Sequence, residues 1–140
     1  MLGRPVFIAG ASGVAAPPRW LAPVLRVSVA GVWLITAVVS AWLHPVSASL
    51  ALLTSIGVPA SLAPAALYGA AALDFLLGVL TLLPWRGRWL WTAQILLIVV
   101  YTLIITWRLP QLWLEPFGPV TKNLPMLALL LALREMDGRR

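Results

Sequence analysis

The sequence predicts an all-α integral membrane protein, built as a four-helix transmembrane bundle with a short re-entrant or interfacial helix after the first span. Hydrophobic residues make up 61% of the 140 residues, charged residues only 10%, and the mean hydropathy is +0.96. Soluble domains are far less apolar. The positive charges flank the apolar runs and form no stripe interleaved with aromatics, so the net charge of +6 indicates a membrane and no nucleic-acid partner.

Residues 1–23 are polar and rich in glycine and proline compared with the rest of the chain. Their apolar part is short and broken, which does not fit the uninterrupted core of a signal peptide. We expect a flexible cytoplasmic leader over residues 1–23, one transmembrane domain over residues 24–136, and a cytoplasmic tail over residues 137–140.

The first span is predicted from Val24 to Leu43. Arg26 lies near its start, where a long side chain can reach the lipid headgroups. His44 and Pro45 end the span, and the next apolar stretch, Ala48–Ile56, is too short to cross a bilayer. This stretch is therefore predicted as the re-entrant or interfacial helix.

The second span, Ala65–Leu83, carries a single carboxylate, Asp74, at its midpoint. As a helix it is long enough to cross the roughly 30 Å hydrocarbon layer. Ala66, Ala70 and Gly78 share the face of Asp74 at four-residue spacing, and such small residues let transmembrane helices approach closely. A carboxylate at the bilayer centre costs a few kcal/mol unless it is turned inward, paired or neutralised. Asp74 is therefore predicted to point into the bundle.

The third span is predicted from about Trp89 to Trp107, with a tryptophan anchor at each end. The prolines and aromatics of residues 109–121 predict a rigid cap at the membrane surface. The fourth span, Asn123–Leu133, is only 11 residues long, and a full-length span would draw Lys122 into the membrane. Either the last helix is short and the bilayer thins, or Lys122 is submerged and faces protein.

The charges of the connecting segments predict the orientation. With both termini in the cytoplasm, that side holds eight arginines, at positions 4, 19, 26, 86, 88, 134, 139 and 140. The opposite side then keeps only Arg108 and Lys122. Such a split over short loops agrees with the positive-inside rule, so four spans with both ends inside are expected.

Three stretches succeed one another between Arg26 and Leu133: Val32-Trp33-Leu34, then Leu67-Tyr68-Gly69-Ala70-Ala71-Ala72-Leu73-Asp74, then Pro116-Phe117-Gly118-Pro119 with Lys122-Asn123-Leu124-Pro125. In this succession they resemble the DoxX-like membrane proteins. The resemblance implies a four-helix bundle in a bacterial cytoplasmic membrane. The wider group includes a subunit associated with quinone-linked sulfur oxidation and proteins that assist the assembly or maturation of other membrane or redox proteins. The resemblance therefore supports fold and location better than activity.

Asp74 is the first candidate site residue, and two roles stay open for it. It could carry a proton or bind a ligand in a low-dielectric bundle, or it could be a structural hydrogen-bond acceptor tying helices together. Its candidate partners in this buried polar centre are Tyr68, Gln94, Tyr101 and Arg26. Arg26 lies about 12 Å along the helix axis from mid-span, so it is expected more often at the headgroups than beside Asp74.

A second set of residues is expected at the outer mouth of the bundle. Lys122 and Asn123 are either ordinary boundary residues or contacts for an oxygen of a quinone or lipid headgroup, with Phe117 and Trp113 closing over a pocket. His44 is expected at the interface as a hydrogen-bonding residue. A lone imidazole without neighbouring Cys, Asp or Glu is no metal site.

The chain has no cysteine and one histidine, so it cannot hold a disulfide, a thiolate metal site, covalent haem or a bis-histidine haem alone. We expect an accessory protein, no enzyme on its own, that binds a lipid or quinone or a partner redox protein in the membrane. Two alternatives stay open. One is a membrane subunit of a quinone-linked oxidoreductase whose cofactors lie in another chain, and the other is a small proton-coupled transporter that uses Asp74 and works as a homo-oligomer.

Overall fold

The computed structural model describes residues 17–84, 87–115 and 120–138, and all of its regular elements are helices. In chain order they are α1 (Leu21–Val38), a π-helical segment η1 (Val39–Leu43), α2 (Val46–Ser55), α3 (Ala63–Leu82), α4 (Arg88–Arg108), a 3₁₀ segment η2 (Pro110–Trp113) and α5 (Asn123–Gly138). This confirms the predicted all-helical class. Of the predicted leader, residues 1–16 lie outside the described part of the chain.

Three helical stretches within the described ranges are long and apolar enough to cross a membrane: Leu21–Leu43, Ala63–Leu82 and Arg88–Arg108. The first begins three residues before the predicted Val24, because the Leu21 amide already bonds the carbonyl oxygen of Pro18 at 3.0 Å. Its last turn is π-helical, with the His44 amide bonded to Val39 at 2.8 Å. Extended backbone at His44, before Pro45, then ends it.

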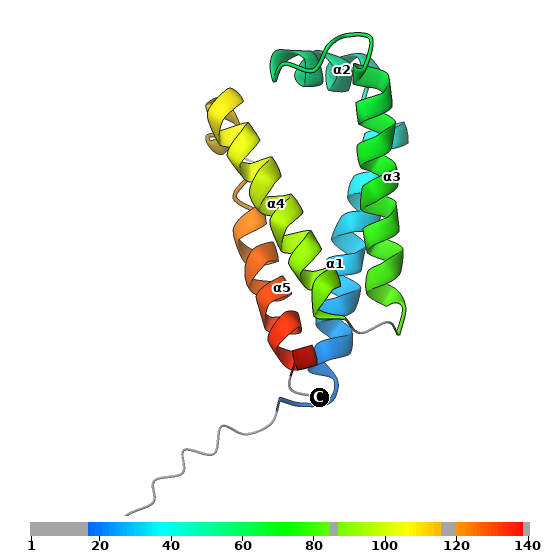
Figure 1. Ribbon diagram of the computed structural model, residues 1–140, viewed down its shortest axis with the longest axis vertical. Coiled ribbons are helices and arrows are strands. Elements are labelled where there is room, and N and C mark those ends of the chain that lie inside the picture. The colour runs from blue at the N-terminus through cyan, green and yellow to red at the C-terminus, as the bar shows by residue number, and fades with distance from the viewer. Residues whose placement is uncertain (1–16, 85–86, 116–119, 139–140) are drawn as a thin grey trace, which may run out of the picture.

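The short apolar helix predicted after the first span is α2 (Val46–Ser55), which lies across the end of the bundle (Figure 1). Gly57 follows the last turn of α2, and its φ of 103° is a left-handed conformation that favours glycine. The Arg108 guanidinium lies against this glycine, 3.3 Å from where a Cβ would be. We call this end of the molecule the α2 end, and the opposite end, where α1 begins and α5 finishes, the terminal end.

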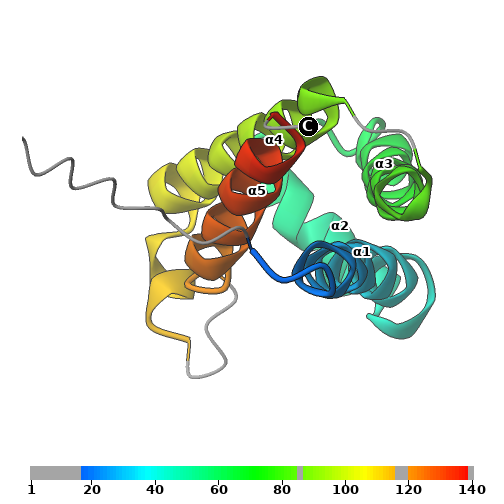
Figure 2. The same cartoon turned by 90° about the horizontal axis from the view of Figure 1, so that it is seen from below.

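Helices α1 and α3 form one closely packed pair (Figures 1 and 2). Gly78 explains their close approach, because a Cβ there would lie 2.7 Å from Cγ of Leu34 and 3.3 Å from the carbonyl oxygen of Ala30. Of the small residues predicted on this face of α3, Gly78 is the one at the close contact, whereas Ala66 and Ala70 line a pocket. Asp74 lies one turn away on the same face.

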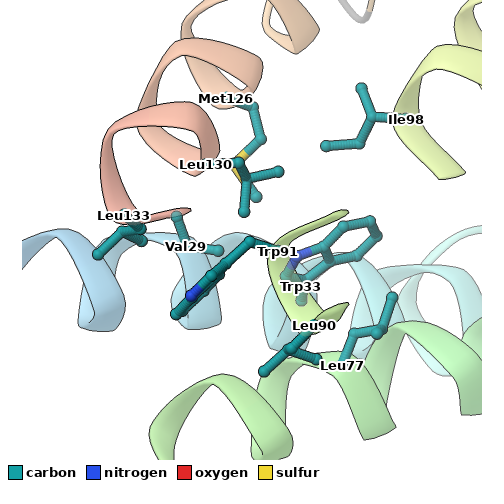
Figure 3. Packing of buried hydrophobic residues seen from close by; sticks show 9 residues of the cluster. All are labelled: Val29, Trp33, Leu77, Leu90, Trp91, Ile98, Met126, Leu130 and Leu133. Carbon is teal, nitrogen blue, oxygen red and sulfur yellow. The ribbon is translucent and has the colours of Figure 1, made fainter. Parts of the chain in front are cut away.

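Helices α4 and α5 form the second pair, and the two pairs meet mainly where α1 contacts α5. They splay apart toward the α2 end, with α4 and α5 on one side and α1 and α3 on the other (Figure 1). The apolar core lies where the pairs meet, around Trp33, Trp91 and Leu130, with side chains from all four long helices (Figure 3).

The fourth helix differs from the prediction in its end point. Asn123 begins it as predicted, but α5 continues past Leu133 to Gly138, because Asp137 packs inside the bundle. At 16 residues it is about 24 Å long, still shorter than a typical hydrocarbon layer. The prediction that this helix also crosses the membrane therefore requires local thinning.

Candidate functional site

Asp74 faces the interior, as the sequence predicts. Only 6% of its surface is exposed, and Oδ1 is buried without a hydrogen-bond partner among the described residues. Buried polar atoms without a partner are rare, because each one loses its bonds to water and gains nothing. Asp74 is therefore unlike the other buried polar side chains of the described ranges, Thr81 and Gln94, which have partners inside the bundle.

The Asp74 carboxyl group lines a cavity of about 160 Å³, which we call the Asp74 cavity. All four long helices contribute to its wall: Val32, Trp33 and Thr36 from α1, Asp74 from α3, Ile98 and Tyr101 from α4, and Asn123 and Met126 from α5. The wall thus has a carboxyl, two hydroxyls and an amide among apolar side chains. Such a mixture suits a ligand that is mostly apolar and is oriented by a few hydrogen bonds.

Gln94 was a predicted partner of Asp74, but it is bonded elsewhere. Its Oε1 accepts a hydrogen bond from Nε1 of Trp33 at 2.7 Å, and its Nε2 donates to Oγ1 of Thr81 at 3.0 Å. Gln94 is fully buried, so these bonds link α1, α3 and α4 in the interior. Sequence reasoning missed Trp33 and Thr81 as its partners, and no spacing pattern connects residues from three different helices.

The two tyrosines predicted near Asp74 lie in different places. Tyr101 lines the Asp74 cavity, whereas Tyr68 is half exposed. Tyr68 lines a separate, apolar groove between α1 and α3, of about 320 Å³, together with Trp42 and Phe75. Of the two, only Tyr101 shares a cavity with Asp74.

Arg26 is paired with Asp137 and belongs to the terminal end, so the prediction that places it in the buried polar centre is wrong in position. Its Nη2 lies 2.7 Å from Oδ2 of Asp137, and the Trp91 indole donates to the same oxygen at 2.8 Å. The Arg26 guanidinium also lies 5.1 Å from the ring centre of Trp91. Asp137, predicted to lie in the cytoplasmic tail, has a side chain only 5% exposed.

The residues predicted for the outer mouth do not gather into one site. Lys122 is exposed, while Asn123 lines the Asp74 cavity and donates to Thr102 at 2.8 Å. Trp113 donates to Thr106 at 3.0 Å, which holds η2 against the end of α4. Phe117 lies outside the described residues.

His44 lies in a different pocket, of about 550 Å³, between η1, α2, α3 and η2. We call it the outer pocket. Nδ1 of His44 is 3.1 Å from the hydroxyl of Ser49. Glu115 and Ser40 line the same pocket, among alanine, valine and leucine side chains. No group of three or more potential metal ligands occurs in residues 17–84, 87–115 and 120–138.

The family assignment rests on a comparison with known families. The sequence model of the DoxX-like family matches residues 30–131. This range includes every described residue that lines the Asp74 cavity. The chain belongs to the DoxX-like family. Together with its three long apolar helices, this makes it a membrane protein. No curated protein and no solved structure matches the chain.

Proposed function

We propose that this DoxX-like protein is a non-enzymatic accessory protein that binds a lipid or a quinone through the Asp74 cavity. One observation carries the proposal: Asp74, whose Oδ1 is buried without a partner among the described residues, lines a cavity formed by all four long helices. A ligand that hydrogen-bonds this oxygen removes the cost of leaving it unsatisfied. A well-packed apolar side chain at position 74 would stabilise the fold more than this carboxyl group does.

The chemistry of the cavity wall limits the ligand. The carboxyl of Asp74 accepts a hydrogen bond in either protonation state, and its protonated form also donates one. The phenol of Tyr101 and the amide of Asn123 are further polar groups. No basic side chain is among the described residues that line the cavity, so an uncharged carbonyl or hydroxyl fits better than a phosphate. A quinone ring or the hydroxyl of a lipid has this chemistry.

We place the protein in a bacterial cytoplasmic membrane with both termini in the cytoplasm. The distribution of charge supports this orientation. Arg26, Arg88 and Arg134 lie at the terminal end, whereas Arg108, the last residue of α4, lies at the α2 end. Cytoplasmic ends of membrane proteins are enriched in arginine and lysine.

Native mass spectrometry from lipid nanodiscs tests the proposal, combined with solvent extraction and identification of the molecules that co-purify. We expect a bound quinone or lipid in the wild-type chain, and about tenfold weaker retention in Asp74→Leu, since the loss of one good hydrogen bond costs about 1.4 kcal/mol. Glu135→Leu is the matched control, because it replaces an exposed carboxylate that lies outside the cavity. Equal retention by Asp74→Leu and the wild type would sink the proposal.

The same spectra separate the two alternatives. A partner chain with its own redox cofactor, present in fixed stoichiometry, would favour a membrane subunit of a quinone-linked oxidoreductase. A stable homo-oligomer with neither ligand nor partner would favour a proton-coupled transporter that uses Asp74. Either result would replace the accessory role.

A further inference from the structure

The outer pocket lies directly next to the Asp74 cavity. Along α1, Thr36 lines the cavity and Ser40, one turn later, lines the outer pocket. Along α3, Asp74 lines the cavity and Ala70, one turn earlier, lines the outer pocket. Residues four apart on a helix are about 6 Å apart and on the same face. The Asp74 cavity and the outer pocket are therefore both lined by the first helix and by α3, on the same face of each helix. The outer pocket lies one turn closer to the α2 end.

In the opposite direction the interior is filled. Gln94 and Thr81 are 0% exposed, and Gln94 is hydrogen-bonded to both Trp33 and Thr81. Beyond this layer lie two more fully buried side chains, Trp91 and Leu133. The ion pair of Arg26 and Asp137 comes next, at the terminal end. Three successive layers of packed side chains thus separate Asp74 from the terminal end.

The arrangement of the helices agrees with this asymmetry. The pairs α1–α3 and α4–α5 meet near the terminal end and splay apart toward the α2 end, where α2 lies across the opening (Figure 1). The wall of the outer pocket is mostly alanine, valine and leucine. Of its four polar residues, Ser40 lies next to the cavity, and His44, Ser49 and Glu115 belong to segments at the α2 end. Apolar walls below a polar rim suit the passage of an amphiphile.

We infer that the outer pocket is the entrance to the Asp74 cavity, so that a ligand reaches Asp74 from the α2 end and not from the terminal end, with its polar group at Asp74 and its apolar tail in the outer pocket. The nature of the ligand rests on the proposed function. The route does not, because it depends only on how the helices and side chains pack. With the orientation given above, the ligand comes from the outer half of the membrane.

Single cysteines test the route, since these 140 residues contain no cysteine. A membrane-impermeant thiol reagent is added to one side or the other of sealed vesicles that contain the Ser40→Cys, Thr36→Cys or Thr81→Cys variant. Ser55→Cys, at an exposed position of α2, and Glu135→Cys, at an exposed position near the end of α5, report which side faces the reagent. We expect Ser40→Cys and Thr36→Cys to react only from the side that labels Ser55→Cys. Thr81→Cys should react at least about tenfold more slowly from either side, because a buried thiol must wait for local opening.

A plug in the outer pocket gives a second, independent readout. Ala70→Trp fills the pocket next to the cavity, whereas Ala72→Trp, on the same helix, projects into the separate groove lined by Tyr68. Ala70→Trp should slow the labelling of Thr36→Cys about tenfold, because the thiol then becomes buried. Ala72→Trp should leave the labelling rate unchanged.

Three results would overturn the inference: reaction of Thr36→Cys from the Glu135 side, no reaction of Thr36→Cys from either side, or equal slowing by both tryptophans. None of these measurements needs a bound ligand. Failure of the route is therefore distinguishable from failure of the proposed function, which the mass spectra report.

Discussion

Replacement of Gly78 by alanine tests whether the contact between α1 and α3 is as close as the structure describes. The added Cβ would lie 2.7 Å from Cγ and 2.8 Å from Cδ2 of Leu34, and 3.3 Å from the backbone oxygen of Ala30. The leucine can rotate, but the backbone oxygen cannot move without the helix. Overpacking of this kind costs about 1–3 kcal/mol.

The glycine-to-alanine change also has a favourable part, because alanine restricts the unfolded chain and favours a helix by roughly 0.5–1 kcal/mol. Gly69 on the same helix isolates this part, since nothing lies within 4 Å of its Cβ position. The gain in helix propensity from glycine to alanine is the same in Gly78→Ala and Gly69→Ala, so it cancels when their stabilities are compared. Gly78→Ala should therefore be less stable than Gly69→Ala by the clash alone, about 1–3 kcal/mol.

Reversible unfolding in mixed micelles, monitored by tryptophan fluorescence, measures this difference. Leu34→Ala makes room for the new methyl group, so Gly78→Ala should cost less in the Leu34→Ala background than in the wild type, as a double-mutant cycle measures. If Gly78→Ala proves as stable as Gly69→Ala, the helices are further apart than described and the close approach beside Asp74 is wrong.

Three further predictions concern the ends and the interior of the bundle. Asp137→Asn leaves the largely buried Arg26 without its counter-ion and should destabilise the protein by about 3–5 kcal/mol. The double variant with Arg26→Met should be less affected. A denaturant titration that shows no such rescue would contradict the pairing. Trp33→Phe removes the hydrogen-bond donor to Gln94. A double-mutant cycle with Gln94→Leu should give a coupling energy of roughly 0.6–1.7 kcal/mol. A coupling energy of zero would mean that the hydrogen bond contributes nothing to stability. Gly57→Ala should cost about 1 kcal/mol of strain at a φ of 103° in the same unfolding assay, and an unchanged stability would show that α2 ends differently.

The sequence alone predicts the helical class, the short helix after the first span and the inward position of Asp74. These depend on the length of apolar runs and on residues of one helix face, which are local properties. The buried state of Asp74 results from the cost of a carboxylate in lipid, whichever helices surround it.

The partners of the polar residues could not be predicted in the same way. Gln94 is bonded to Trp33 and Thr81, and Arg26 to Asp137, and each of these pairs joins different helices. Helical spacing does not say which helices are neighbours. One signal was nevertheless present: Leu130, Leu133 and Asp137 recur at intervals of three and four, which indicates that α5 continues past its predicted end.

The packing partners of the long helices have a consequence for how the chain is made. Although α3 and α4 are consecutive in the sequence, α3 packs mainly on α1 and α4 mainly on α5. The first half of the chain can therefore complete its own pair in the bilayer while the ribosome is still synthesising the second half. Two separately expressed fragments, divided between α3 and α4, should each insert as a hairpin-like unit and reassemble across the core around Trp91.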